Sequence, residues 1–122
     1  MLDLNSILVF SEDPEKLADF YQKVFDKKPD WSEGNCFGFM VGKGFITICP
    51  HDKVRGKNKN PERIMFNFET TEVKGEFERI KKLRATVVAE PYNPAEDPKG
   101  WIATLADPDQ NYFQLVTPWE NK

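Results

Sequence analysis

The sequence predicts an α+β fold built from two βαβββ modules in tandem. Short segments of alternating apolar and polar residues, which are typical of strands, are interrupted twice by a segment of helical periodicity. The same order of elements occurs in both halves of the chain. The helical residues Phe20 and Phe77 are 57 positions apart, and so are the capping candidates Asp13 and Thr70. This regular offset indicates an internal repeat, although few residues are identical between the halves.

Length and composition favour one domain over several. A chain of 122 residues, 39% of them apolar, can bury one core or two small halves that share it. We expect a single domain over 1–122, with modules at about 1–50 and 62–122 joined by a basic linker at 51–61. The formal charge of -3 argues against nonspecific nucleic-acid binding. No apolar run approaches the roughly 20 residues that span a bilayer.

Two further features predict the compartment. The N-terminal residues lack the basic and apolar regions of a signal peptide, so the sequence predicts a cytoplasmic protein that does not bind membranes. Cys36 and Cys49 have neither CxxC spacing nor a secretory context, and we therefore expect reduced, buried thiols.

The first module is organised around an amphipathic helix. Asp13 can cap the first free amides, proline at position 14 suits the first turn, and apolar residues recur at i, i+3, i+4 and i+7. A Gly-Lys-Gly turn then joins two alternating segments into a hairpin. The expected elements are a strand at 4–10, a helix at 14–26, a short strand at 31–32, and strands at 36–41 and 45–49.

The second module repeats this order after a polar linker without periodicity. Thr70 or Thr71 is the expected helix cap, and Val73, Phe77 and Ile80 share one helical face. The last stretch, 101–119, predicts a hairpin because Asp107-Pro108-Asp109-Gln110-Asn111 interrupts two alternating segments with turn residues. The expected elements are strands at 64–68 and 85–89, a proline-rich and acidic loop at 91–100, and the two strands of the hairpin.

These motifs resemble the glyoxalase/bleomycin resistance protein/extradiol dioxygenase group, the vicinal oxygen chelate (VOC) superfamily. The resemblance covers nearly the whole chain. It rests on the Asp13-Pro14 cap seven residues before Phe20-Tyr21, and on the DPDQN turn that leads into a strand ending in Val-Thr-Pro. It implies that each module curls its strands into half of a mixed barrel-like sheet that encloses a cleft. In that family Gly usually stands where this chain has Gln110.

The resemblance also implies four metal-ligand positions, commonly His, Glu, His and Glu. They align with Ser6, Thr47, Arg63 (or Ile64 after a shift of one residue) and Gln114. Hydroxyls, a guanidinium and an amide are poor ligands for a divalent cation. We therefore expect no metal and no other cofactor, and the family's metal-dependent reactions lose their support. Arg63 could instead hold a carboxylate or phosphate of a ligand, or simply end the linker at the surface.

Other residues that could bind a metal or act as a general base are also explained by structural or surface roles. His51 is the one histidine of the chain and lies near Cys49 and Asp52, but a short local segment rarely supplies a closed metal site. Four carboxylates in or beside strands are candidate general bases or, alternatively, caps and turn residues. No catalytic residue can be assigned. These carboxylates are Glu33, Glu69, Glu90 and Asp107.

The leading hypothesis is a metal-free member of the superfamily that binds a small molecule in an aromatic-lined cleft. A second hypothesis is a glyoxalase-type lyase or isomerase, or a dioxygenase, with a divergent metal site. A third is a structural or regulatory dimer with a vestigial cleft. The resemblance further implies a homodimer. The expected cleft residues are Ser6, Phe37, Phe39, Thr47, Arg63, Trp101 and Gln114.

Overall fold

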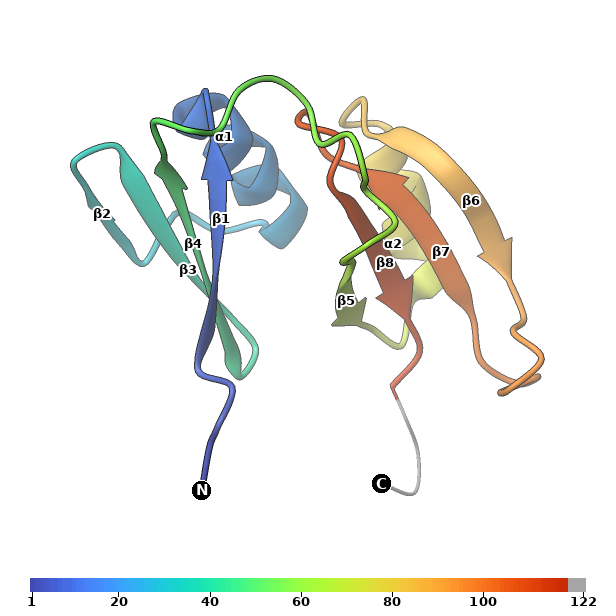
Figure 1. Ribbon diagram of the computed structural model, residues 1–122. Helices are drawn as coiled ribbons and strands as arrows, with labels where there is room; N and C mark the ends of the chain where they lie inside the picture. The colour runs from blue at the N-terminus through green and yellow to red at the C-terminus, as the bar shows by residue number, and fades with distance from the viewer. Residues whose placement is uncertain (119–122) are drawn as a thin grey trace. The chain divides into compact units, whose positions relative to one another are not determined.

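A computed structural model describes residues 1–118 of the chain. The chain divides into two units, 1–56 and 57–122, and each unit carries a four-stranded mixed sheet with one helix against one of its faces (Figure 1). The element order is βαβββ in both units. The predicted α+β class and the tandem repeat are therefore confirmed. Trp119 lies outside the described residues.

The first unit contains a sheet of order β1-β4-β3-β2, in which β1 and β4 are parallel and the other pairs are antiparallel. The helix α1 begins as predicted, because the Asp13 side chain accepts a hydrogen bond from the Lys16 amide and Pro14 occupies the first turn. Its buried face includes Leu17, Tyr21 and Val24. The elements are β1 Ser6–Ser11, α1 Pro14–Phe25, β2 Trp31–Glu33, β3 Cys36–Val41 and β4 Gly44–Pro50.

The second unit repeats this topology with the order β5-β8-β7-β6. The predicted helix cap is wrong: Glu72 is the capping residue, while Thr70 accepts a hydrogen bond from the Glu72 amide just before the helix. The buried residues Val73, Phe77 and Ile80 have the spacing of Leu17, Tyr21 and Val24 in α1 and also that of Pro14, Ala18 and Tyr21, so the pattern of burial does not match Phe77 to Phe20. The elements are β5 Phe66–Glu69, α2 Val73–Lys81, β6 Thr86–Tyr92, β7 Ile102–Ala106 and β8 Tyr112–Val116.

The predicted reduced thiols are wrong, because Cys36 and Cys49 form a disulfide. The two residues lie opposite each other on the antiparallel strands β3 and β4, with Cα atoms 4.3 Å apart. Such close pairs occur at the non-hydrogen-bonded positions of antiparallel ladders. The two cysteines are 13 residues apart in the sequence, and they meet only because of the register of the hairpin. The spacing of the cysteines did not reveal this register.

The linker is attached to both units instead of running free between them. The Glu12 carboxylate accepts a hydrogen bond from the Gly56 amide at 2.9 Å, which holds the end of the first unit. The Asn58 amide donates to the Asp109 carbonyl oxygen at 2.8 Å, and the side chains of Asn58 and Asn111 are also hydrogen-bonded. The chain therefore leaves the first unit at Gly56 and enters the second at Lys57.

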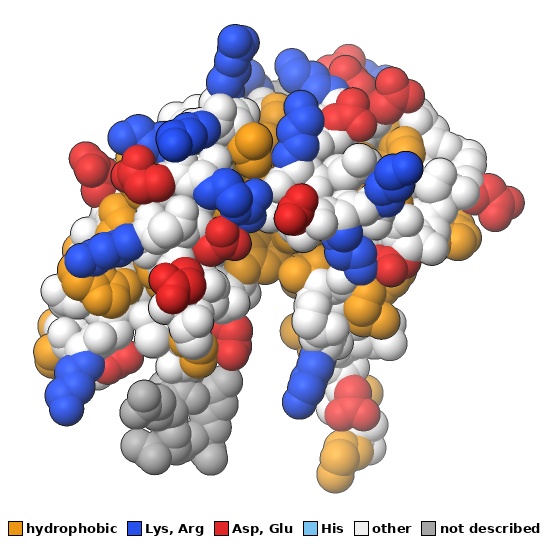
Figure 2. All heavy atoms as spheres, turned by 180° about the vertical axis from the view of Figure 1, so that it is seen from behind, with side chains coloured by type: hydrophobic (Ala, Val, Ile, Leu, Met, Phe, Trp, Pro, Cys, Tyr) orange, Lys and Arg blue, Asp and Glu red, His pale blue; other side chains and the backbone are white. Residues whose placement is uncertain are grey.

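Charged side chains of both signs are interspersed over the surface seen in Figure 2, with no large region of one sign. This distribution agrees with the small negative charge of the chain and gives no basic field for nucleic acid on that face. Among residues 1–118, no helix is both long enough and apolar enough to cross a bilayer.

The turn between β7 and β8 is built around the buried Asp107 carboxylate. Its Oδ1 atom accepts hydrogen bonds from the amides of Asp109 and Asn111 at 2.9 and 3.0 Å. Gln110 takes a left-handed conformation with φ of 66°, at the position where the resembling family has Gly. A side chain in this conformation is strained because its Cβ atom approaches the backbone.

Relief of this strain gives a direct prediction. Replacing Gln110 with Gly should raise the free energy of unfolding by about 0.5 to 1 kcal/mol, because the gain exceeds the entropy that glycine loses on folding. Replacing Gln110 with Val, which is β-branched, should lower it. Urea denaturation of the two variants and the wild type measures the effect. A less stable Gly variant would contradict the assigned turn.

Candidate functional site

Each sheet has one face against its helix and one open face, and alternation along the strands assigns side chains to them. In the first unit, the helix face carries buried residues such as Val9, Phe39 and Ile48. The open face carries Ser6 and Leu8 on β1, and the paired residues Phe45 and Thr47 on β4. A ligand that binds this sheet therefore meets the second set.

Aromatic rings do cover the open face of the first sheet, but they are not the predicted ones. Gly38 lies between Phe45 and Trp31, and a Cβ atom at Gly38 would stand only 2.7 Å from the Cζ atom of Phe45. The Phe45 ring can thus lie over β3 only because position 38 has no side chain. Leu8 and Trp31 on the same face are 59% and 47% exposed, so this apolar surface is open within the unit.

The open face of the second sheet carries a row of polar side chains across three strands. Asn67 on β5 pairs with Gln114 on β8, which pairs with Thr104 on β7. The Nε2 atom of Gln114 donates a hydrogen bond to the Thr104 hydroxyl at 3.0 Å. This hydrogen bond fixes the orientation of the Gln114 side-chain amide. The carbonyl oxygen of the same side chain can still accept a hydrogen bond.

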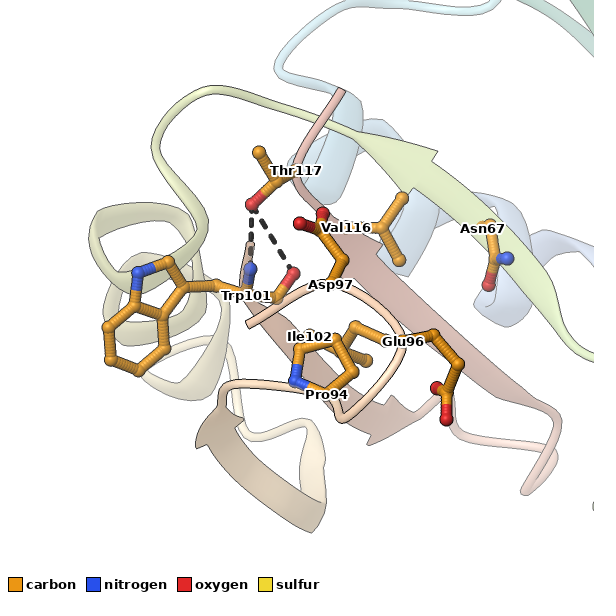
Figure 3. Close-up of a pocket in the computed structure, with 8 residues that line it drawn as sticks. All are labelled: Asn67, Pro94, Glu96, Asp97, Trp101, Ile102, Val116 and Thr117. Carbon is orange, nitrogen blue, oxygen red and sulfur yellow. Dashed lines mark hydrogen bonds between the residues drawn. The ribbon is translucent and has the colours of Figure 1, made fainter. Parts of the chain in front are cut away.

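A pocket of about 220 Å³ lies on the second unit, beside this row (Figure 3). Ile102 and Val116, which are paired on β7 and β8, supply an apolar floor together with Pro94. Polar groups come from an amide, a hydroxyl and two carboxylates. The lining residues are Asn67, Pro94, Glu96, Asp97, Trp101, Ile102, Val116 and Thr117.

The pocket wall formed by the loop 93–100 is held by hydrogen bonds within the loop. The Asn93 side chain donates to the Gly100 carbonyl oxygen at 2.7 Å, which closes the loop at its base. The amides of Asp97 and Gly100 donate to the carbonyl oxygens of Pro94 and Asp97, which makes two successive turns. Pro94 is buried. The wall therefore has a defined conformation before any ligand binds, which lowers the entropy cost of binding.

Three of the seven predicted cleft residues place their rings toward the helices. Phe39 is fully buried, and its ring contacts that of Phe25 on α1 with centroids 5.4 Å apart. Phe37 lies two residues before Phe39 on β3 and therefore points to the same face of the sheet. The Trp101 ring points away from the pocket (Figure 3), and the Lys74 ammonium of α2 lies 3.7 Å from its centroid. Trp101 therefore lines the pocket with the atoms nearest its backbone and not with its ring.

The other four predicted residues have different positions. Ser6 and Thr47 share the open face of the first sheet, and Gln114 lies on the open face of the second. Arg63 is exposed and precedes β5, with its amide donating to the Asn60 carbonyl oxygen. The structure does not bring the Arg63 guanidinium into the pocket of the second unit.

Strand pairing identifies a different counterpart of Ser6. In the first unit Leu8 pairs with Thr47, and in the second unit Asn67 pairs with Gln114. Ser6 is two residues before Leu8, so its counterpart is Met65, two residues before Asn67. The predicted alignment with Arg63 or Ile64 is therefore wrong by register. The reason is that the offset of 57 was taken from Phe20 and Phe77, whereas the paired residues of β1 and β5 differ by 59.

With this register, the four positions that the resemblance aligns with metal ligands hold Ser6 and Thr47 in the first unit and Met65 and Gln114 in the second. None of these four side chains is a carboxylate or an imidazole, the usual protein ligands of the divalent ions in question. Within residues 1–118, no three His, Cys, Asp or Glu side chains gather in a way that could hold a metal. Cys49, which is near His51 in the sequence, forms the disulfide with Cys36 and offers no thiolate to a metal.

Sequence reasoning missed the residues that form the pocket floor and wall. Gln114 is a predicted cleft residue, and alternation then places Val116 on the same face and the strand pairing places Ile102 opposite Val116. That signal was available in the sequence. The loop 93–100 gave no such signal, because its position over the sheet depends on long-range packing.

Comparison with known proteins agrees with this architecture. The family described as Glyoxalase-like domain matches residues 6–116. No curated protein matches the chain significantly in sequence. Among solved structures, a glyoxalase-related enzyme from Fulvimarina pelagi is 17% identical with a TM-score of 0.79, over 97% of this chain and 89% of that one.

Two further structures show the same fold. A glyoxalase/bleomycin resistance protein/dioxygenase family enzyme from Burkholderia phytofirmans is 23% identical, with a TM-score of 0.75 over 95% of this chain and 98% of that one. The fosfomycin resistance protein FosX from Listeria monocytogenes is 22% identical, with a TM-score of 0.74 over 98% and 96%. With the family match over nearly the whole chain, the conclusion is that this protein belongs to the Glyoxalase-like domain family of the VOC superfamily.

Proposed function

We propose that this protein binds a small organic molecule without a metal ion, and that the pocket on the open face of the second sheet is the binding site. The observation that carries the proposal is the combination of a formed pocket with unsuitable metal positions. The pocket has an apolar floor of Ile102 and Val116 and a few polar groups at its rim, which is the usual composition of small-molecule sites.

The chemistry of the four metal positions supports binding over the family's metal-dependent reactions. One form of FosX from Listeria monocytogenes has been crystallised with Mn(II) and a dihydroxypropylphosphonic acid. In this chain the equivalent positions offer Ser6, Thr47, Met65 and Gln114, and Gln114 already uses its nitrogen to bind Thr104. Neutral oxygens would not replace the hydration shell of a divalent cation. A divergent lyase, isomerase or dioxygenase would need ligands from elsewhere in the chain.

The test is a fragment screen by two-dimensional amide NMR, carried out in EDTA. We expect hits that shift the amide signals of Ile102, Val116 and Thr117 without added metal. At 100 times its Kd, such a ligand should stabilise the protein by about 2.7 kcal/mol in thermal unfolding. Hits that bind only after manganese, nickel or zinc is added would contradict the proposal and favour the enzyme hypothesis.

A matched pair of variants locates the binding. Val116→Phe places a larger side chain in the floor of the pocket, whereas Val88→Phe makes the same change at an exposed position of β6 outside it. The first variant should lose the hits and the second should keep them. If both variants bind equally well, the pocket is not the site. If no fragment binds the wild type, the structural or regulatory hypothesis gains support.

We also propose that the protein forms a homodimer. Within the first unit the open sheet face exposes Leu8, Trp31 and Met40, and an apolar surface of this kind is commonly covered by another chain. Sedimentation at micromolar concentration tests this, and a monomer would count against it. The cytoplasmic location stays a prediction, and the Cys36–Cys49 disulfide weakens it because structural disulfides are rare in that compartment.

A further inference from the structure

We infer that the ligand of the second-unit pocket carries a positive charge, in the form of a small amphipathic amine. This inference rests on the proposed function, because it names the ligand class of the same site. It is carried by three features of the pocket: the charge of its wall, the apolar character of its floor, and its size.

The wall contributes two acidic residues and no cationic residue to the pocket, and the carboxylate of Asp97, unlike that of Glu96, is directed toward the other lining side chains (Figure 3). Glu96 and Asp97 both line it, and neither side chain has an ion pair or hydrogen bond within residues 1–118. In Figure 3 the Asp97 carboxylate points toward Val116 and Thr117. An ammonium group placed beside it would form a charge-assisted hydrogen bond, whereas a carboxylate or phosphate would be repelled.

Nearby cations do not neutralise this wall from within the pocket. The Lys74 ammonium is held over the Trp101 ring, which points away from the pocket (Figure 3). Lys99 belongs to the same loop but is exposed and is not among the lining residues. The charge that a ligand meets at this site is therefore negative.

The position of Asp97 depends on the absence of a side chain at Gly100. A Cβ atom at Gly100 would collide with the Asp97 carboxylate and lie 3.0 Å from its Cγ atom. Gly100 is buried, and its carbonyl oxygen is held by Asn93. The loop thus packs the carboxylate tightly against its own backbone on one side, so the orientation of this acceptor is restricted before binding.

The floor and the volume define the rest of the ligand. Pro94, Ile102 and Val116 favour an apolar body, and Thr117 has its hydroxyl engaged by the Trp101 amide at 2.8 Å. The volume of about 220 Å³ is below the roughly 300 to 1,000 Å³ of sites for drug-sized ligands. A single ring or a branched aliphatic chain with one amino group matches this site.

Three probes of similar size test the charge, and benzylamine and benzyl alcohol also share the same carbon skeleton. Benzylamine, benzyl alcohol and benzoate are titrated separately at pH 7 and low salt, and the amide signals of Ile102, Val116 and Thr117 are followed by NMR. We expect benzylamine to bind about fivefold more tightly than benzyl alcohol, the upper range for an exposed ion pair, and benzoate to bind least. The preference for benzylamine should shrink as salt is raised.

Neutralising variants assign the effect to the wall. Asp97→Asn and Glu96→Gln should each reduce the preference for benzylamine over benzyl alcohol. The control Glu78→Gln removes one negative charge from an exposed position of α2 outside the pocket and should leave the preference unchanged.

The outcomes separate this inference from the proposed function. If benzyl alcohol or benzoate shifts the same amides with equal or higher affinity than benzylamine, the charge inference is overturned while the pocket remains a binding site. An unchanged preference in Asp97→Asn would also overturn it. If none of the three probes shifts these amides at millimolar concentration, the charge inference and the proposed binding site both fail.

Discussion

Replacing Phe77 with Ala is expected to lower the free energy of unfolding of this protein by about 3 to 5 kcal/mol. Phe77 is 1% exposed and lies on the buried face of α2, between Val73 and Ile80. Its removal deletes the largest apolar side chain that this helix packs against the second sheet. The loss combines the transfer free energy of the ring with the cost of the cavity that remains. Thermal and urea denaturation measure the change.

A control on the same helix separates packing from helix propensity. Glu78→Ala alters the neighbouring exposed position and should change stability by no more than about 0.5 kcal/mol. Phe20→Ala removes a ring that is 8% exposed, and we also expect a loss of about 3 to 5 kcal/mol, since this residue belongs to the core of the first unit. Unchanged melting temperatures for both Phe variants would show that the helix faces are wrongly assigned.

The second prediction concerns metal binding and has the largest expected effect on any property. Calorimetric titration of the wild type with nickel, zinc and manganese should show no stoichiometric binding at micromolar concentration. The resemblance implies that the four positions share one metal site, so the variant Ser6→His, Thr47→Glu, Met65→His, Gln114→Glu should bind at least one of these ions with a Kd in the micromolar range, a standard binding free energy of about -8 kcal/mol. It supplies the two imidazoles and two carboxylates that the family positions require.

A matched variant tests the strand register at the same time. It carries Arg63→His in place of Met65→His, with the other three substitutions unchanged. The register of β5 against β8 places residue 65, and not residue 63, in the position equivalent to Ser6. The Arg63 version should therefore bind more weakly. Tight binding by the wild type would contradict the metal-free proposal, and tighter binding by the Arg63 version would contradict the register.

The local sequence determined the elements themselves. Asp13 and Pro14 predicted the start of α1, because a capping carboxylate and a fixed φ act within a few residues. The turn at 107–111 was also predictable, since Asp107 hydrogen-bonds to amides two and four positions away. The repeat of βαβββ units followed from the order of these local signals.

Tertiary structure alone decided how the elements combine. Alternation showed that Phe37 and Phe39 share a face, but only the packing of α1 showed that this face is the core. Three other features were also decided by tertiary structure. They are the Cys36–Cys49 disulfide, the choice of Met65 instead of Arg63 as the counterpart of Ser6, and the position of the loop 93–100 over Ile102. Each depends on strand register or long-range contact. Periodicity divides a strand into two faces, whereas burial of apolar surface against a distant segment decides which face turns inward.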